Sequence, residues 1–314
     1  MKNLFNGVIL AAVLAAMSGC QRSEAPAVQG ETVEASFFIS LDGLVSKAYS
    51  DGLSATSLQA LVYSVREGGY KFLPNVSVTD ATISGSTRLS LRLVKGETYE
   101  IVFWAQNPDG PYSVDAVSGT MKVNPSGPAN AEQRDAFYKT WTGKVAGSIN
   151  ERVELRRPFA QINVLTSAAD YAAALDNEIA FSGSSMKVSA PTVLDFHTGK
   201  TSVPAAYDLS AAPLKVDAPN VPGYEDTVEG GVTVANYKYV AMNYILAGDR
   251  TNTQVLFSVY REGSEAPLYD YSVLNVPYQR NYRTNILGDI FSVDGVFDIV
   301  IIPEYEEPQN SVNI

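Results

Sequence analysis

Residues 89–105 read LSLRLVKGETYEIVFWA, and this stretch decides the fold class. Leu89, Leu91 and Leu93 alternate with polar residues, which is the period-two pattern of a strand with one buried face. Residues 99–105 are apolar at nearly every position, as expected for a central strand buried on both faces. Because residues 95–97, Lys-Gly-Glu, have turn chemistry, we predict that the two segments form a β-hairpin.

Similar apolar runs bounded by turn residues recur along the chain. In the first half they predict strands at residues 33–41, 58–65 and 70–73, with a turn at residues 67–69 between the last two. In the second half they predict strands at residues 152–165, 185–194, 232–246, 253–261, 268–276 and 297–302. The first of these is expected to bend at Pro158, because proline cannot donate a ladder hydrogen bond.

Helical patterns are short. Residues 130–141 predict a short helix capped by Asn130, with Phe137, Tyr138 and Trp141 available for burial. A second helix is predicted to begin after Ser167, with Asp170 in the capping-box position, and to end near residue 177. Residues 203–231 are rich in proline and acidic residues and predict a long connection.

These patterns predict an all-β protein with minor helices and two β-sandwich domains. The 314 residues suffice for two ordinary domains, and 46% of them are apolar. Residues 142–150 are small and polar, so we place the boundary near residue 150. The predicted domains are residues 33–150 and 151–314.

The N-terminus has the pattern of a secretion signal. Lys2 precedes an apolar run at residues 8–16 that is too short to span a membrane, and Met17-Ser18-Gly19-Cys20 follows. This ending resembles a bacterial lipobox, and Cys20 is the only cysteine of the chain. We therefore predict that residues 1–19 are removed, that Cys20 is lipidated, and that residues 20–32 form a tether. The alternative is an ordinary signal peptide that leaves a free thiol.

Charge excludes one class of partner. Without the signal peptide, 22 basic residues face 34 acidic ones, a net charge of −12. Such a surface repels phosphate backbones, so we expect no nucleic acid partner. Loss of Cys20 to lipid would leave no cysteine for a disulfide, so stability has to come from apolar cores.

The sequence carries no recognisable catalytic motif. His197 is the single histidine, between an expected strand end and a turn, and no nucleophile motif accompanies it. Zinc sites need several cysteine or histidine ligands, and no glycine-rich phosphate loop is present. We predict no catalytic residue, no metal site and no cofactor. Paired carboxylates of a glycosidase cannot be recognised by spacing, so a surface glycosidase stays an alternative.

Four segments carry a resemblance to a known family. They are residues 104–106 (WAQ), 157–163 (RPFAQIN), 239–246 (YVAMNYIL) and 276–288 (VPYQRNYRTNILG). Over nearly the whole mature chain, the sequence resembles the fimbrillin-like lipoproteins, which are type V pilins and accessory subunits of anaerobic Gram-negative bacteria. The resemblance implies two tandem transthyretin-like β-sandwich domains, export as an outer membrane lipoprotein, and assembly into or attachment to surface fimbriae.

The same resemblance implies a non-enzymatic structural or adhesive subunit, in an anchor, accessory or stalk position. Its partners would be other fimbrial subunits, the outer membrane through the lipid, and a host or bacterial surface ligand. A lipid-anchored carbohydrate-binding surface protein is the alternative. From the residues themselves, we expect Trp104 in the core and expect Arg280 and Arg283 to bond backbone carbonyls at a sandwich corner.

In stalk fimbrillins an arginine-specific protease removes the first strand, and a partner's strand refills the groove by β-strand addition. Here no arginine lies between Arg22 and Arg66, and Lys47 is the only basic residue between them. We therefore predict that any maturation cleavage is at Lys47. The segments proposed for strand exchange are marked by Val33, Phe37, Ile39 and Leu41 in the first strand and by Phe297, Ile299 and Ile301 in the last.

Overall fold

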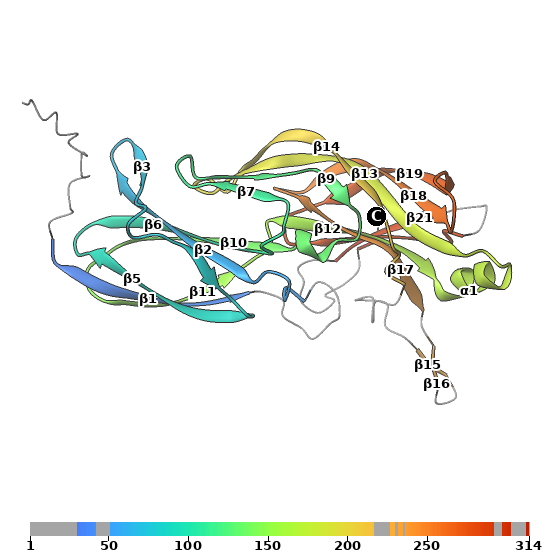
Figure 1. Cartoon of the computed structure of the whole chain (residues 1–314), viewed down its shortest axis with the longest axis horizontal. Coiled ribbons are helices and arrows are strands. Elements are labelled where there is room, and N and C mark those ends of the chain that lie inside the picture. Colours follow the sequence, from blue (N-terminus) through green and yellow to red (C-terminus); the bar gives the residue numbers. More distant parts are fainter. Residues whose placement is uncertain are drawn as a thin grey trace, which may run out of the picture.

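Two β-sandwiches lie end to end along the long axis of the protein (Figure 1). The structure is a computed structural model that describes residues 30–41, 51–216, 227–229, 232–234, 236–291, 297–302 and 312–313. These residues form strands β1 to β22, the α-helix α1 (Ala168–Asp176) and a 3-10 helix η1 (Glu132–Arg134). The predicted all-β class with minor helices is therefore confirmed, and the transthyretin-like arrangement of each sandwich stays a prediction.

The N-terminal sandwich packs a three-stranded sheet against a larger one. The first sheet has the order β11 (Ile149–Leu155), β1 (Thr32–Leu41), β5 (Ser86–Val94). The second has the order β10 (Ala136–Lys144), β6 (Thr98–Gln106), β2 (Ser57–Arg66), β3 (Gly69–Phe72), and β4 (Val78–Thr82) also pairs with β2. Alternate residues of each strand meet in an apolar core between the sheets.

The C-terminal sandwich is larger and also has two sheets. One has the order β17 (Tyr237–Leu246), β12 (Phe159–Ser167), β20 (Arg283–Gly288), β21 (Phe297–Ile302), β22 (Val312–Asn313). The other has the order β19 (Pro267–Tyr278), β18 (Thr251–Arg261), β13 (Phe181–Asp195), β14 (Thr201–Ala212), β9 (Ser126–Pro128). The hairpin of β7 (Tyr112–Asp115) and β8 (Thr120–Val123) joins it through β13, and β15 (Thr227–Glu229) pairs with β16 (Val232–Val234).

Most of the predicted strands are present, but some predicted pairings and elements are wrong. Strands β5 and β6 do not form the predicted hairpin, because β5 pairs with β1 in one sheet and β6 pairs with β2 and β10 in the other. The turn at residues 95–97 therefore joins the two layers of the sandwich. The predicted hairpin of β2 and β3 is confirmed.

The predicted helix at residues 130–141 is also wrong. Only the single turn η1 forms there, and the chain continues as β10, which pairs with β6 along its whole length. Residues 152–165 form two strands in different sandwiches, β11 and β12, in place of one bent strand. Residues 203–212 of the predicted long connection belong to β14 instead, because β13 offers a long edge for pairing.

The second predicted helix is confirmed. Ser167 is the N-cap of α1, and its hydroxyl accepts a hydrogen bond from the backbone N–H of Asp170 at 3.1 Å. The Asp170 carboxylate accepts from the Thr166 hydroxyl at 2.7 Å and from the backbone N–H of Phe291 at 2.8 Å. The acidic residue of the first turn thus ties the helix to the end of the C-terminal sandwich.

In the described part of the chain, three segments cross from one sandwich to the other, and they are residues 107–111, 129–135 and 156–158. As a result, β7 to β9 belong to the C-terminal sandwich, whereas β10 and β11 return to the N-terminal one. Strand β11 pairs with β1 across the predicted boundary at residue 150. The limits 33–150 and 151–314 stay a prediction for folding units, but strand pairing does not follow them.

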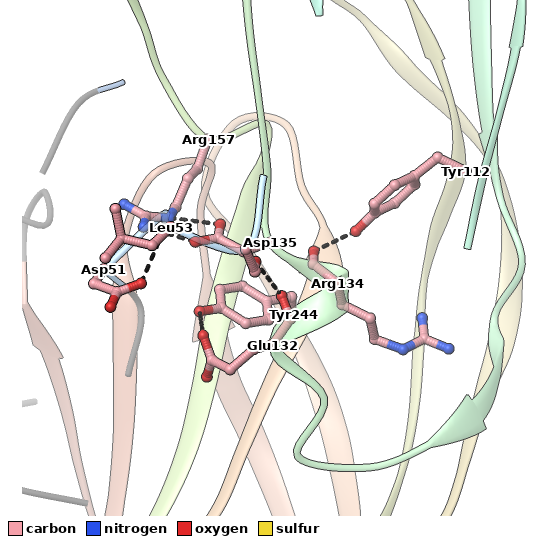
Figure 2. A network of polar contacts seen from close by, with 9 residues as sticks. Asp51, Leu53, Tyr112, Glu132, Arg134, Asp135, Arg157 and Tyr244 are labelled. Atoms are coloured by element: carbon pink, nitrogen blue, oxygen red, sulfur yellow. Dashed lines mark hydrogen bonds and ion pairs between the residues drawn. The ribbon is translucent and has the colours of Figure 1, made fainter. Parts of the chain in front are cut away.

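A buried ion pair joins the second and third crossings (Figure 2). Arg157 donates from Nε and Nη2 to the two carboxylate oxygens of Asp135 at 2.7 and 2.8 Å, and both side chains are 0% exposed. The guanidinium also lies 4.4 Å from the centre of the Phe137 ring. Burial raises the pKa of Asp135, and Arg157 opposes this shift. The two hydrogen bonds between Arg157 and Asp135 offset the free-energy cost of removing both charges from water. They can form only when both crossings are in place.

Further polar groups fix the second crossing. Asn130 has a left-handed backbone, with φ 56°, and its side-chain oxygen accepts from the backbone N–H of Met242 at 3.0 Å. Its own backbone N–H donates to Asn243 Oδ1 at 2.9 Å. Figure 2 also shows the Tyr112 hydroxyl donating to the backbone oxygen of Arg134. The crossing is thereby bonded to strands of the C-terminal sandwich before β10 enters the N-terminal one.

Replacing Asp135 by Asn should lower the free energy of unfolding by about 3–5 kcal/mol, because the buried Arg157 would lose its counter-charge. Urea unfolding measures this difference. The control is Asp208→Asn, which breaks the exposed Lys187–Asp208 pair of 3.3 Å and should change stability by less than about 1 kcal/mol. Equal effects of the two substitutions would show that the ion pair does not hold the crossings together.

Candidate functional site

The first strand, β1, alternates between core and surface. Ala35, Phe37, Ile39 and Leu41 are buried, and Val33 is partly buried against the same core. The centroid of the Phe37 ring lies 5.2 Å from that of the Phe103 ring and 5.4 Å from that of the Trp141 indole. The residues proposed for strand exchange in the first half therefore share one face and fill the N-terminal core.

Strand β1 is the central strand of its sheet. It pairs in parallel with β11, from Ala35 beside Ile149 to Leu41 beside Leu155, and antiparallel with β5. Within the described part of the sheet, β5 and β11 have no other strand between them. Removing β1 would leave a groove floored by apolar residues and bordered by two strands with open backbone groups.

The second proposed segment is β21. It pairs with β20 along its length, and Val300 and Ile301 also face β22 across the other edge. Ile299 is partly buried against the C-terminal core, and Phe297 begins the strand beside Gly288. Cys20 and Lys47, the predicted lipidation and cleavage positions, lie outside the described residues, so both assignments stay predictions.

His197 lies where the two sandwiches meet. Its Nδ1 atom shares a hydrogen bond with the Glu100 carboxylate, 97 positions away on β6. The imidazole stacks on Tyr70 with 3.9 Å between ring centroids, and it meets the edge of Tyr63 at 4.7 Å. Gly119 has a φ of +66°, and a Cβ atom there would collide with the imidazole. The histidine predicted as a turn residue is thus packed into the junction.

Glu100 is a buried acid on an apolar strand, with 2% of its surface exposed. Burial raises the pKa of its carboxyl, whereas the hydrogen bond and charge of His197 lower it, and the first effect is the larger. The predictions from sequence did not single out Glu100. The sequence did contain a signal for it, because Glu100 is the one charged residue in the apolar run 99–105. A carboxylate buried there needs a polar hydrogen-bonding partner.

The predicted structural roles of Arg280 and Trp104 agree with their contacts. Arg280 donates to the backbone oxygens of Ala247 at 3.1 Å and Gly199 at 2.6 Å, and to the Tyr138 hydroxyl at 2.9 Å. Trp104 is fully buried, on the face of β6 that meets the C-terminal sandwich. Arg283 is buried on β20, beside Gln161 of β12.

No helix among the described residues is long and apolar enough to cross a bilayer. The same residues contain no group of three or more histidine, cysteine, aspartate or glutamate side chains placed to hold a metal ion.

Comparisons with known proteins give one family and several similar folds. A family model described as a family of unknown function, DUF6562, matches residues 55–314. No curated protein matches the sequence.

The similar solved structures include three fimbrial proteins. A fimbrial assembly protein from Parabacteroides distasonis is 12% identical, with 87% of this chain and 96% of that chain covered and a TM-score of 0.44. The fimbrial anchor protein Mfa2 from Porphyromonas gingivalis is 12% identical, with 85% and 97% covered and a TM-score of 0.42. The tip fimbrial protein Mfa3 from the same organism is 10% identical, with 86% and 99% covered and a TM-score of 0.42.

Glu100→Gln should change how stability depends on pH. Because the native pKa of Glu100 is raised, its contribution to stability is present below the ordinary value of 4.5 and is lost as pH rises through the raised value. The free energy of unfolding of the wild type, relative to that of the variant, should therefore fall as pH rises from about 4.5. Urea unfolding at a series of pH values measures this difference, and a constant difference would contradict it.

Proposed function

The chain belongs to the DUF6562 family of unknown function, and we propose that it is a non-enzymatic structural or adhesive subunit of a cell-surface fimbria. The observation that carries this proposal is the position of β1. It is the first described strand of the chain, yet it fills the centre of a sheet and much of one core. A strand of this kind can be exchanged between subunits, because its place in the sheet is defined by neighbours that remain behind.

The chemistry of the first sheet supports exchange by β-strand addition. Both β5 and β11 would present free backbone donors and acceptors to an incoming strand, which gives affinity. The sites vacated by Phe37, Ile39 and Leu41 would accept apolar residues at every second position of the incoming strand. This requirement would fix the register of that strand. Strand β21, with Phe297, Ile299 and Ile301, is the second segment we propose for exchange, since it adds to the outer edge of β20.

A non-enzymatic role is supported by how the reactive residues are used. His197, the only histidine, is held between two tyrosine rings and a buried carboxylate. Arg157 and Asp135 are fully buried together. These groups stabilise the junction between the sandwiches, because fully bonded buried polar groups make a structure more rigid.

We propose an outer membrane location from the sequence of the N-terminus. A basic start, a short apolar run and Ser18-Gly19-Cys20 favour export and lipidation of Cys20. Two or three acyl chains would make the attachment effectively permanent, because each buried methylene contributes about 0.8 kcal/mol. A subunit fixed in this way would anchor a fimbria or act as an accessory to it.

Electron microscopy of cells with and without the gene product tests the proposal directly. Loss of fimbriae, or a change in their length or their retention on the cell, supports a subunit role. Fimbriae unchanged in number, length and attachment would overturn it.

Cys20→Ala should release the protein from the membrane fraction or leave an unprocessed precursor, because the thiol is the acceptor for the lipid. Cell fractionation and gel migration measure this, and Ser23→Ala, three residues further on, is the control that should leave both unchanged. A Cys20→Ala protein that fractionates and migrates like the wild type would show that Cys20 is not an anchor.

The N-terminus of the protein recovered from cells should distinguish its roles. A start at Ala48 would show cleavage at Lys47 and support strand exchange in a growing polymer. A blocked, acylated start at Cys20 would show that β1 is retained and support an anchor or accessory role. A start at Ser23, after Arg22, would leave β1 in place without the lipid and would contradict both.

A further inference from the structure

A cleft of about 970 Å³ opens at the junction of the two sandwiches. One wall comes from β10 and the third crossing, with Tyr138, Lys139 and Arg156. The other wall comes from three turns of the C-terminal sandwich, at residues 196–201, 248–249 and 279–282. Its volume lies near the upper end of the range of roughly 300–1,000 Å³ that small-ligand sites occupy.

The charge of this cleft is opposite to that of the protein. Lys139, Lys200 and Arg280 line it, and the exposed Asp249 is the one carboxylate among its described lining residues. The guanidinium of Arg157, which also lines the cleft, is paired with Asp135. In a chain with a net charge of −11, this local excess of cations focuses a positive potential into the cleft.

Arg280 is the cleft cation whose contacts are best defined. Its three hydrogen bonds go to the neutral oxygens of Ala247, Gly199 and Tyr138, and its guanidinium lies 5.7 Å from the Tyr138 ring centroid. These bonds use three of the five N–H donors, so two stay available among the described residues. These bonds fix its orientation, and no carboxylate of the described residues forms an ion pair with it, which suits it to bind an anion.

The remaining polar groups of the cleft suit a saccharide better than a peptide. Threonine hydroxyls and side-chain amides line it, and these are the usual partners of sugar hydroxyls; they are Thr140, Thr198, Thr201, Gln279 and Asn281. An extended peptide that binds by β-strand addition would need an open strand edge. At Tyr138 that edge is closed, because its backbone N–H and carbonyl both pair with Arg156, at 2.9 and 3.2 Å.

We propose that this cleft binds an acidic saccharide, whose carboxylate or sulfate group lies against Arg280 between Lys139 and Lys200. The neutral hydroxyls of the sugar would bond the threonine and amide side chains of the turns. The site is separate from β1.

Isothermal titration of the purified mature chain tests the proposal with three probes of equal length. They are oligogalacturonate, which carries carboxylates, a heparin oligosaccharide, which carries sulfates as well, and neutral oligogalactose. We expect at least one acidic probe to bind about tenfold or more tightly than the neutral one, and its affinity to fall as salt rises. The stronger of the two acidic probes identifies the anionic group.

The double variant Lys139→Gln, Lys200→Gln should weaken binding of the acidic probe about tenfold or more. Both side chains are exposed, so the fold should tolerate the change, whereas Arg280 holds the junction and is left intact. The control is Lys122→Gln, Lys144→Gln, which removes the same charge from exposed positions outside the cleft. No binding of either acidic probe, equal loss in both variants, or equally tight binding of hexaglutamate would overturn the proposal.

Discussion

The fully buried ion pair between Asp135 and Arg157 is the constraint on which the arrangement of the two sandwiches depends. Each residue lies on a different passage of the chain from one sandwich to the other. Neither charge can be buried alone without a large desolvation penalty. The second crossing, residues 129–135, is therefore stable in its place only when the third, residues 156–158, is present. This requirement places β10 and β11 in the N-terminal sandwich after the chain has already built β7 to β9 in the C-terminal one. The two sandwiches are therefore interdependent in their connections, although each has two sheets of its own.

The sheet that contains β6 shows the consequence for packing. Ile101 and Phe103 belong to the core of the N-terminal sandwich, whereas Val102 and Trp104 face the C-terminal one and join its core. The strand is apolar on both faces because it separates two cores. Where this second face ends, polar groups take over, and Glu100 meets His197 there. The same junction forms the wall of the cationic cleft, so the geometry of that cleft is fixed by the contacts that hold the sandwiches together.

Local patterns in the sequence predicted most strands and the helix after Ser167, because alternation and capping depend on residues only a few positions apart. These local patterns gave wrong predictions where pairing with a distant strand determines the structure. The same alternation in residues 89–105 fits a hairpin or a connection between layers, and only the pairing of β5 with β1 decides between them. Residues 130–141 carry apolar residues at helical spacing, yet pairing with β6 makes residues 136–141 part of a strand. The site was predictable only in part, since His197 and Glu100 are 97 positions apart and neither has a local motif.

Strand exchange and ligand binding would occupy different places but share one strand. Strand β11 pairs with β1 up to Leu155, and the next two residues, Arg156 and Arg157, line the cleft. A partner strand that replaced β1 would become the new neighbour of β11 and so would set the position of these two arginines. Any resulting change in the affinity of the cleft has a reciprocal effect, because an anion that binds one arrangement more tightly must favour the strand that produces it by the same free energy. The buried pair with Asp135 limits how far Arg157 can move, so Arg156, which is exposed on the cleft wall, is the residue through which such coupling would act.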